Sequence, residues 1–549
     1  MGFKETIEKC FADAVLAAGF AGSGTRLVLE KPRVKEHGDI SCPIAMSLAR
    51  EFKKNPMEIA ESITARAVFP PGTVASAEVA RPGYINLKIA PAVLVENLAE
   101  IRARGESYGS SGFGGGRKCQ VEYVSANPTG PLVVVSARAA AVGSSIVNLL
   151  RAVGYRVESE YYVNDYGNQV EALGTSLRFR VRENRGLLDP GEEIGAYPGD
   201  YLKTLAAAVP DERAREWDAD PPRAIAGYGA YATEALLSTI REDLDRFGVR
   251  FDSFFRESTL HPDGIAEARS IIEREGYAYV EEGALHFRTT AFGDEKDRVL
   301  VKSDGKATYF LGDVAYHLTK VRRGYDWIID ILGPDHHGHI PRMKAAAAVL
   351  GAGDRWFQAL LVGWVRLMEG GKQVSMSKRA GEFVTLRDLI SDVGTDVAKY
   401  FFLMRRADSP LDFDLELARK QSDENPVYYV QYAHARISSV LRFASEKTPD
   451  QPREEADLAA LSSSEERDLM VHLLFFPYVV EGAALAREPH RMTVYAKELA
   501  TLFHQFYHAH RIVTDDTRVT AARLYLAEAT RTVLKNSLSL LGVSAPSSM

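Results

Sequence analysis

The stretch from Lys118 to Val163 most constrains the fold of this chain, because it contains a strand, a helix and a second strand in close succession. KCQVEYVS and YRVESEYYVND are rich in β-branched and aromatic residues, which is typical of strands. Between them, the residues from Leu132 to about Val153 carry an alanine-rich helical pattern that stops at Gly154. A strand–helix–strand unit of this size predicts a parallel sheet in an α/β fold.

The rest of the chain divides around this unit. Residues 1–110 have the pattern of a small α/β domain, which a glycine-rich linker follows. Residues 111–370 carry the predicted parallel sheet, with a mostly helical, proline-containing insertion at about 175–290. Residues 371–425 form a connecting region. Residues 426–549 show an almost continuous helical pattern without a strand run, which predicts a separate all-α bundle.

Composition excludes several classes of protein. A chain of 549 residues with 46% hydrophobic content can bury several cores. Its three cysteines are too few and too scattered for a disulfide framework or a zinc cluster. The net charge of −7 argues against attraction of nucleic acid by the whole surface but leaves room for local basic patches. No uninterrupted apolar run approaches the ~18 residues that cross a bilayer, and the N-terminus lacks a signal peptide. We therefore expect a cytoplasmic protein without a membrane association.

Polar residues cluster where the first predicted strand ends, in VEYVSANPTGP. The turn after a parallel strand and the N-terminus of the next helix usually form a ligand crevice. Glu122 and Asn127 place polar groups there, and Ser125 either contacts a ligand or caps the turn. Asn-Pro and Thr-Gly are also common in ordinary loops, so turn chemistry alone is the alternative interpretation.

A second candidate is the pair Tyr309 and Asp313 in KATYFLGDVAYH. Residues four apart project from one face of a helix. A carboxylate beside a phenol hydroxyl can hold a cationic substrate through a charge-assisted hydrogen bond. The alternative is a solvated aspartate beside a core tyrosine.

Histidines gather in the loop ILGPDHHGHI, which follows another predicted strand. His336, His337 and His339 suggest a metal site, but no cysteine, aspartate or glutamate partner stands at a fixed spacing. Hydrogen bonding to a ribose, a phosphate or the backbone is the favoured interpretation. No protein-held metal is predicted.

The segment EGGKQVSMSKRAGEFVTL combines flanking glycines with the cations Lys372, Lys378 and Arg379. A basic loop that closes on a polyphosphate can stabilise charge that develops in a transition state. A solvated basic turn is an equally good interpretation of the spacing alone.

These pieces occur together in an order that resembles the bacterial arginine–tRNA ligases, which are class I aminoacyl-tRNA synthetases. VEYVSANPTGPL, YYVNDYGNQ, TYFLGDVAYH, LGPDHHGH, SMSKRAGEFVTLRDLI, NPVYYVQYAHARI and FHQFYHAHRI carry the resemblance across nearly the whole chain. It implies a Rossmann-like catalytic domain, an N-terminal domain that binds the tRNA elbow, and an anticodon-binding helical bundle. Residues 371–425 correspond to a region that carries the signature loop and contacts the tRNA stem. The resemblance further implies that ATP and arginine form an arginyl-adenylate, with tRNA already bound, before the arginyl group passes to tRNA(Arg).

The resemblance also implies roles for individual residues. The positions that match arginine contacts are Glu122, Ser125, Asn127, Tyr309 and Asp313. Those that match the ATP site are Gly130, Val133, Val135, Gly333, Asp335, His336, Met376 and Lys378, with Ser136, Ser377 and Lys378 as catalytic positions. Those that match the anticodon contacts are Tyr428, Tyr432, Tyr507 and Arg511, although aromatic residues at helical spacing suit a core equally well. Mg²⁺ is expected as the counter-ion of ATP, and the chain is expected to be a monomer.

One signature departs from the family pattern. The four residues after PTGPL should be His-x-Gly-His, but here they are Val133, Val134, Val135 and Ser136. Valine side chains donate no hydrogen bond to a phosphate, and a β-branched residue fills the space that a glycine leaves open. Two hypotheses follow: an active ligase with an altered signature, or a silent relative that still binds tRNA or arginine. Metal-dependent hydrolysis at the histidine loop is a remote third.

Overall fold

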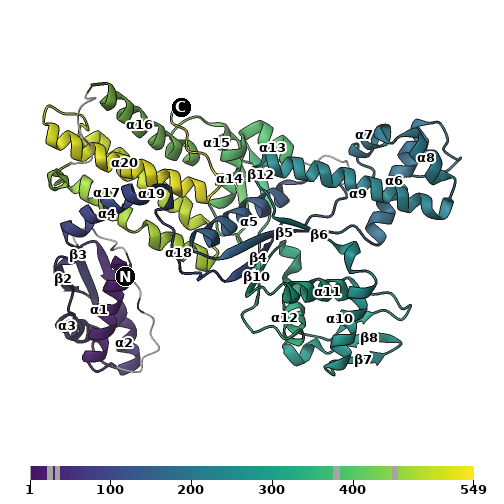
Figure 1. Cartoon of the computed structure of the whole chain (residues 1–549), viewed down its shortest axis with the longest axis horizontal. Coiled ribbons are helices and arrows are strands. Elements are labelled where there is room, and N and C mark those ends of the chain that lie inside the picture. Colours follow the sequence, from purple (N-terminus) through teal and green to yellow (C-terminus); the bar gives the residue numbers. More distant parts are fainter. Residues whose placement is uncertain are drawn as a thin grey trace.

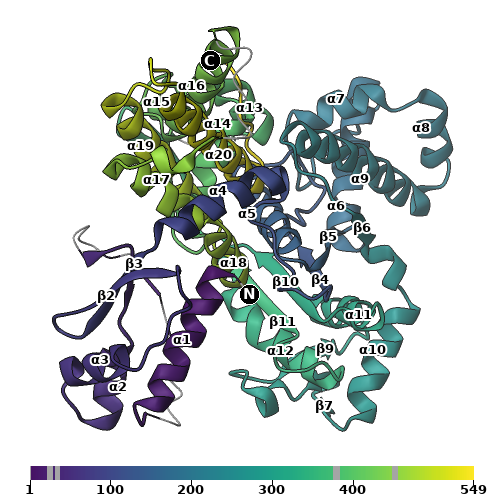
Figure 2. The same ribbon diagram turned by 60° about the vertical axis from the view of Figure 1, so that its left-hand side comes forward.

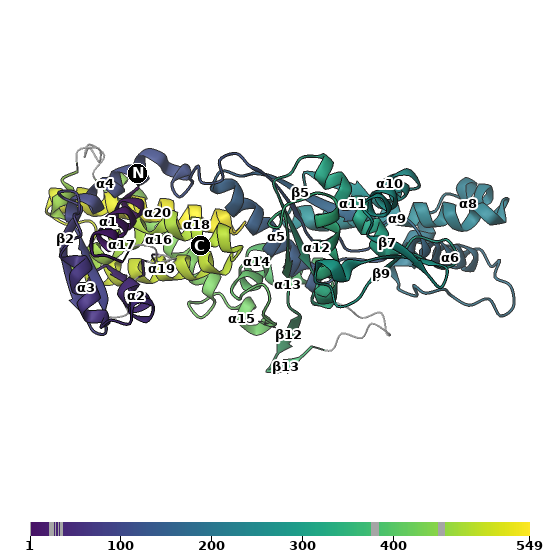
Figure 3. The ribbon, with the colours of Figure 1, turned by 90° about the horizontal axis from the view of Figure 1, so that it is seen from below.

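The computed structural model describes residues 2–20, 27, 29–30, 32, 37–374, 384–447 and 456–549. The molecule is elongated (Figure 3). The small N-terminal domain and the C-terminal helical bundle lie at one end, a group of helices from the middle of the chain lies at the other end, and a parallel sheet lies between them.

The central sheet has five strands in the order β11-β10-β4-β5-β6, and every neighbouring pair is parallel (Figure 1). The strands are β4 (Lys118–Glu122), β5 (Arg156–Val163), β6 (Ser253–Arg256), β10 (Trp327–Leu332) and β11 (Phe357–Leu361). This confirms the predicted α/β fold with a parallel sheet.

Two different cores cover the two faces of this sheet, because successive side chains of a strand point to opposite faces. Val121 and Ile329 belong to the large core that includes α5 (Val134–Ala152). Ile328 belongs to a second core with α11 (Tyr309–Arg322) and α12 (Ile340–Val349). Helix α11 therefore lies over the face opposite α5.

The insertion is helical over a shorter range than expected. Its helices are α6 (Asn168–Asn184), α7 (Tyr201–Ala208), α8 (Asp211–Asp218) and α9 (Pro221–Arg246). The next strand, β6, pairs with β5 and so belongs to the central sheet. Beyond it lie η3 (Glu257–Leu260), α10 (Asp263–Arg274) and an antiparallel sheet of β7 (Ala278–Glu281), β8 (Ala284–Phe287) and β9 (Arg298–Val301), with η4 (Thr289–Phe292) between its last two strands. Strand β6 has only four residues, too few to show a periodicity in the sequence.

The N-terminal domain packs beside the helical bundle (Figure 2). It consists of α1 (Phe3–Ala17), β1 (Ile40–Cys42), α2 (Ile44–Phe52), α3 (Pro56–Thr64), β2 (Val74–Ala80) and β3 (Tyr84–Ile89), with its three strands antiparallel. Helix α4 (Pro91–Arg104) and η2 (Gly105–Ser107) then lead to the central sheet. The Tyr108 hydroxyl, which is buried beyond η2, donates a hydrogen bond to the Leu473 carbonyl of the bundle at 3.1 Å.

The connecting region and the bundle complete the fold. Strand β12 (Val365–Glu369) precedes the connecting region and pairs with two of its strands, β13 (Lys372–Gln373) and β14 (Leu411–Asp414). The helices of the connecting region are α13 (Leu386–Val393), α14 (Thr395–Leu403) and α15 (Leu415–Arg419). The bundle contains α16 (Pro426–Lys447), η6 (Leu458–Ala460), α17 (Ser464–Leu474), α18 (Phe476–Ala486), α19 (His490–Ala509) and α20 (Thr517–Leu540). The stretch Ser464–Ala486 is long and apolar enough to cross a membrane, but 56% of its most apolar window is buried inside the bundle, as in the core helices of globular domains.

Arg138 of α5 bonds to backbone carbonyls of the segments that follow β11 and α14. Its fully buried guanidinium donates to the backbone carbonyls of Gly363, Ser409 and Arg406 at 2.7 to 2.9 Å. Burial lowers the pKa of Arg138 to about 10. These bonds hold the N-terminal part of α5 against the loops that follow β11 and α14.

We expect Arg138→Met to destabilise this part of the fold by about 3–5 kcal/mol, because three carbonyls, one buried and two partly buried, lose their donor and each unsatisfied buried group costs roughly 1–3 kcal/mol. Scanning calorimetry should show a lower unfolding temperature. Arg156→Met, at the exposed start of β5, is the matched control and should leave that temperature nearly unchanged. Equal unfolding temperatures for Arg138→Met and the wild type would contradict this role of Arg138.

Candidate active site

The candidate site lies at the carboxyl edge of the central sheet. The segment after β4 leads to the N-terminus of α5, and η5 (Pro334–His339) follows β10. These two strands are neighbours in the sheet. Because parallel strands end at the same edge, the two loops meet in one place.

The backbone after β4 adopts an unusual conformation. Val124 and Ser125 have positive φ angles of 68° and 38°, in the left-handed region that side-chain-bearing residues rarely adopt. Such conformations cost roughly 1–3 kcal/mol each and cluster at functional sites. The Ser125 hydroxyl donates to Glu122 Oε1 at 3.0 Å and accepts from the Tyr162 amide at 3.1 Å. Ser125 thus connects β4 to β5 and anchors one oxygen of Glu122.

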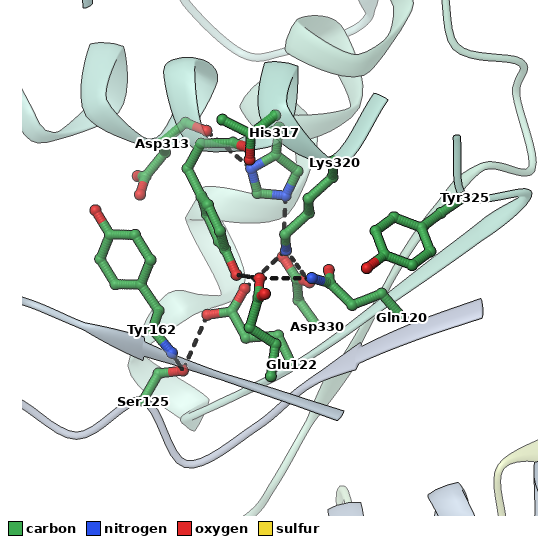
Figure 4. A network of polar contacts seen from close by, with 12 residues as sticks. Gln120, Glu122, Ser125, Tyr162, Asp313, His317, Lys320, Tyr325 and Asp330 are labelled. Carbon is green, nitrogen blue, oxygen red and sulfur yellow. Dashed lines mark hydrogen bonds and ion pairs between the residues drawn. The ribbon is translucent and has the colours of Figure 1, made fainter. Parts of the chain in front are cut away.

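Three carboxylates form a row across the sheet. The strand register places Glu122 beside Asp330 on one side and beside Glu160 on the other. Helix α11 supplies their partners, as Figure 4 shows. Lys320 bonds to Glu122 and Asp330, His317 to Asp330, and Tyr316 and Arg323 to Glu160. The row is buried, and Glu122 is the member that ends its strand.

Asp313 and Tyr309 lie one turn apart at the start of α11, where Thr308 caps the helix and accepts from the Leu311 amide. The Asp313 carboxylate forms an ion pair with His339 Nε2 at 3.2 Å. Tyr309 is 62% exposed, so it is not a core residue. The alternative of a core tyrosine is therefore wrong.

Glu257 was not among the residues singled out from the sequence. It follows β6 directly and is buried. Burial raises the pKa of the Glu257 carboxyl to about 7. A hydrogen bond from the Tyr162 hydroxyl limits this rise, and the nearby charge of Asp313 adds to it. The charges of Glu257, Asp313 and Glu122 all act on the Tyr162 hydroxyl, whose pKa is raised mainly by burial. Three carboxylates therefore lie near enough to act on one phenol, a grouping of acceptors that suits a guanidinium group.

The sequence signal for Glu257 was weak for a structural reason. A glutamate at the carboxyl end of a parallel strand is a candidate ligand contact, but the sequence pattern predicts that this segment belongs to a helical insertion. Recognising SFFR as a strand would have put Glu257 at the same edge as Glu122.

The residues that the resemblance assigns to ATP include several at the N-terminus of α5. Val133 is the N-cap and offers no side-chain hydrogen bond to the helix, while Val135 and Ser136 are half-buried in its first turn. The backbone of Val133 pairs with Thr385, and the Leu386 amide donates to the Leu132 carbonyl at 2.8 Å. The start of α13 is therefore attached directly to the start of α5.

The structure describes four of the other residues that the resemblance assigns to ATP. Gly130 faces the Tyr201 ring of the insertion, where an added Cβ would lie at an ordinary contact distance of 3.6 Å. Gly333 caps η5, and Asp335 and His336 are exposed on it. Ser375, Met376, Ser377, Lys378 and Arg379 lie outside the described residues. Among the residues that the structure describes, no group of three or more His, Cys, Asp or Glu side chains could hold a metal ion.

Aromatic residues of the C-terminal bundle line a cavity of about 410 Å³. Tyr428 stacks on Tyr432 with ring centroids 6.2 Å apart. The Arg436 guanidinium lies 5.4 Å from the Tyr432 ring and 4.4 Å from the Tyr507 ring. Arg511 lies beyond the end of α19, where its carbonyl accepts from Arg523.

The chain matches three family models in succession. They are described as the arginyl tRNA synthetase N terminal domain (residues 4–89), the class I (R) tRNA synthetase catalytic domain (residues 101–402) and the DALR anticodon binding domain (residues 430–549). The arginine–tRNA ligase of Syntrophotalea carbinolica is 46% identical over 552 residues, which cover 99% of this chain and 98% of the relative. The chain belongs to the arginyl-tRNA synthetase family. The ligase of Symbiobacterium thermophilum is also 46% identical, over all of this synthetase.

Solved structures of synthetases share this fold. The arginyl-tRNA synthetase of Thermus thermophilus superposes with a TM-score of 0.80 over 99% of this chain and 100% of its own, at 22% identity. A structure from Campylobacter jejuni, titled as a putative arginyl-tRNA synthetase, is 32% identical and superposes with a TM-score of 0.77 over 83% of this synthetase and 99% of its own chain. The resemblance stated from the sequence is therefore confirmed for the family and the fold.

Proposed function

We propose that this synthetase is an active arginine–tRNA ligase, which joins arginine to tRNA(Arg) through an arginyl-adenylate at the expense of ATP. The observation that supports this most directly is the convergence of Glu257 and Asp313 on the Tyr162 hydroxyl at the carboxyl edge of the sheet. An arginine side chain that enters this acidic pocket would exchange water for charge-assisted hydrogen bonds. Tyr309, one turn before Asp313, would close its outer side.

The two ends of the substrate have separate environments. We assign the guanidinium to Glu257 and Asp313, and the α-amino group to Glu122, with Ser125 holding the Glu122 carboxylate in place. Asn127 is exposed on the same loop and could contact the backbone of the arginine. The arginine carboxylate would then be directed toward the start of α5, where the reaction with the α-phosphate of ATP takes place.

We assign the triphosphate to the N-terminus of α5. The first amides of a helix have no partner within the helix, so they bind anions even where Val133 and Val135 offer no donor. The Ser136 hydroxyl adds one side-chain donor. Gly333, Asp335 and His336 would contact the nucleoside, and Mg²⁺ would accompany ATP as its counter-ion. We further propose that the protein is a cytoplasmic monomer that binds the anticodon with its C-terminal bundle.

The test is ATP–pyrophosphate exchange with arginine and tRNA(Arg) present, together with transfer of labelled arginine to the tRNA. Arginine-dependent exchange well above a control without enzyme is expected. The alternative of a silent relative is motivated by Val133–Ser136. We do not favour it, because the similarity to the ligases extends over 99% of the chain. The absence of both exchange and transfer would contradict our proposal.

Arginine binding should depend on pH through Glu257. Its carboxyl has a pKa of about 7, so it is ionised above this pH and becomes neutral below it. A neutral carboxyl loses its attraction for a guanidinium, so the KM for arginine should rise as the pH falls, by about tenfold between pH 8 and pH 6. Glu257→Gln should give a high KM that no longer changes over this range. A wild-type KM that is constant from pH 6 to pH 8 would contradict the assignment.

A further inference from the structure

Lys320 contacts Glu122 of the proposed arginine site, but the chemistry proposed for that site does not involve the lysine directly. It is fully buried, with 0% of its surface exposed. Its ammonium donates to Glu122 Oε2 at 2.7 Å and to Asp330 Oδ1 at 2.9 Å, and lies 4.2 Å from the centre of the Tyr316 ring. A buried lysine costs several kcal/mol of desolvation, so its presence calls for an explanation.

The two oxygens of Glu122 have different fixed partners. Oε2 bonds to Lys320 of α11, and Oε1 bonds to Ser125 of the strained turn after β4. The carboxylate is therefore held in one orientation from two directions, as Figure 4 shows. Each carboxylate oxygen accepts more than one hydrogen bond, so both retain acceptor capacity for a substrate.

Lys320 also controls the charge of Glu122. The pKa of Glu122 lies above its ordinary value because the carboxyl is buried; the Lys320 ammonium limits this rise, and the neighbouring Asp330 carboxylate adds to it. The charged or titratable groups around Glu122 are Lys320, His317 and Tyr316 from α11, Asp330 from β10, and Tyr162 and Glu160 from β5. Without Lys320, Glu122 would lie between the buried carboxylates of Asp330 and Glu160, in surroundings that favour its neutral form.

We propose that Lys320 is a positioning residue of the arginine site, which orients the Glu122 carboxylate and keeps it ionised for the substrate's ammonium group without touching the substrate. This inference depends on the function proposed above. It assigns a role to a residue that is three helical positions from His317 and seven from Asp313, on the same face of α11 as both.

The test compares Lys320→Met with Arg323→Met. Arg323, at the end of the same helix, pairs with Glu160 at 2.7 Å in the same row but does not touch Glu122. At pH 7.5 we expect Lys320→Met to raise the KM for arginine by about 30-fold or more, as for loss of one partner of a buried pair. The KM for ATP should change less than about threefold. Arg323→Met should leave both KM values near those of the wild type.

The pH dependence separates this role from a purely structural one. In Lys320→Met, Glu122 regains its charge as the pH rises, so the KM for arginine should fall several-fold, and by at most about tenfold, between pH 7.5 and pH 8.5. The KM of Arg323→Met should change over this range no more than that of the wild type. If Lys320→Met does not fold, the double variant Lys320→Met/Asp330→Asn provides the same test, because only one buried carboxylate then lacks the lysine. We expect this variant to show the same rise in the KM for arginine at pH 7.5 and the same fall in this KM between pH 7.5 and pH 8.5.

Equilibrium dialysis with labelled arginine distinguishes the two ways in which this inference can fail. A wild-type protein that does not bind arginine would overturn the pocket and with it the proposed function. A wild-type protein that binds arginine, together with Lys320→Met and Arg323→Met variants of equal KM, would overturn the role of Lys320 alone. A raised KM that does not recover at high pH would also overturn it.

Discussion

The triple variant Val133→His/Val135→Gly/Ser136→His is expected to increase ATP–pyrophosphate exchange by about 10²-fold or more. Loss of a single donor to a transition state typically costs about 10²–10³ in rate, and this variant supplies two imidazole donors. Val133 and Ser136 stand at the cap and in the first turn of α5, where a phosphate would meet the free amides of the helix. Glycine at position 135 removes a β-branched side chain from the same surface.

A second triple variant shows whether donors or space limit the reaction. Val133→Ala/Val135→Ala/Ser136→Ala reduces the bulk at the start of α5 without adding a donor, and its exchange rate should not exceed that of the wild type. Both variants should be checked by calorimetry, because glycine in a helix costs roughly 1 kcal/mol. A folded histidine variant with the wild-type rate would mean that these positions do not contact the reacting phosphates.

The substitution Asp313→Asn is expected to raise the KM for arginine by about 10²- to 10³-fold. It keeps the shape of the side chain but removes the charge that would face the guanidinium, and loss of one partner from a buried charged hydrogen bond costs about 2–5 kcal/mol. Asp313 now pairs with His339, so the variant also frees that imidazole. The KM for ATP should stay within about threefold of the wild-type value.

Asp304→Asn is the matched control for this change. Asp304 lies in the exposed turn before α11, where it accepts a hydrogen bond from the Lys306 amide, and asparagine can accept the same bond. Steady-state aminoacylation with varied arginine gives both KM values. An increase below about tenfold for Asp313→Asn would exclude Asp313 from the guanidinium site.

Local patterns in the sequence determined much of the fold of this protein and part of its candidate site. The strand and helix periods between Lys118 and Val163 predicted the parallel sheet, and four-residue spacing placed Tyr309 and Asp313 on one face of a helix. The start of α5 and the loss of donors at Val133 and Val135 also follow from the sequence, since they depend on residues close together in the chain. Such features need no knowledge of distant partners.

The remaining features of the site depend on pairings between distant segments. The short strand β6 acquires its place in the sheet only by pairing with β5, and this brings Glu257 to the pocket. The register of β10 against β4 sets Asp330 beside Glu122, and the packing of α11 buries Lys320 between them. In the sequence Lys320 is an ordinary helical lysine, of the kind that usually lies in water. Its burial and its charge partners were decided by the tertiary structure, because they arise from contacts between residues up to 198 positions apart.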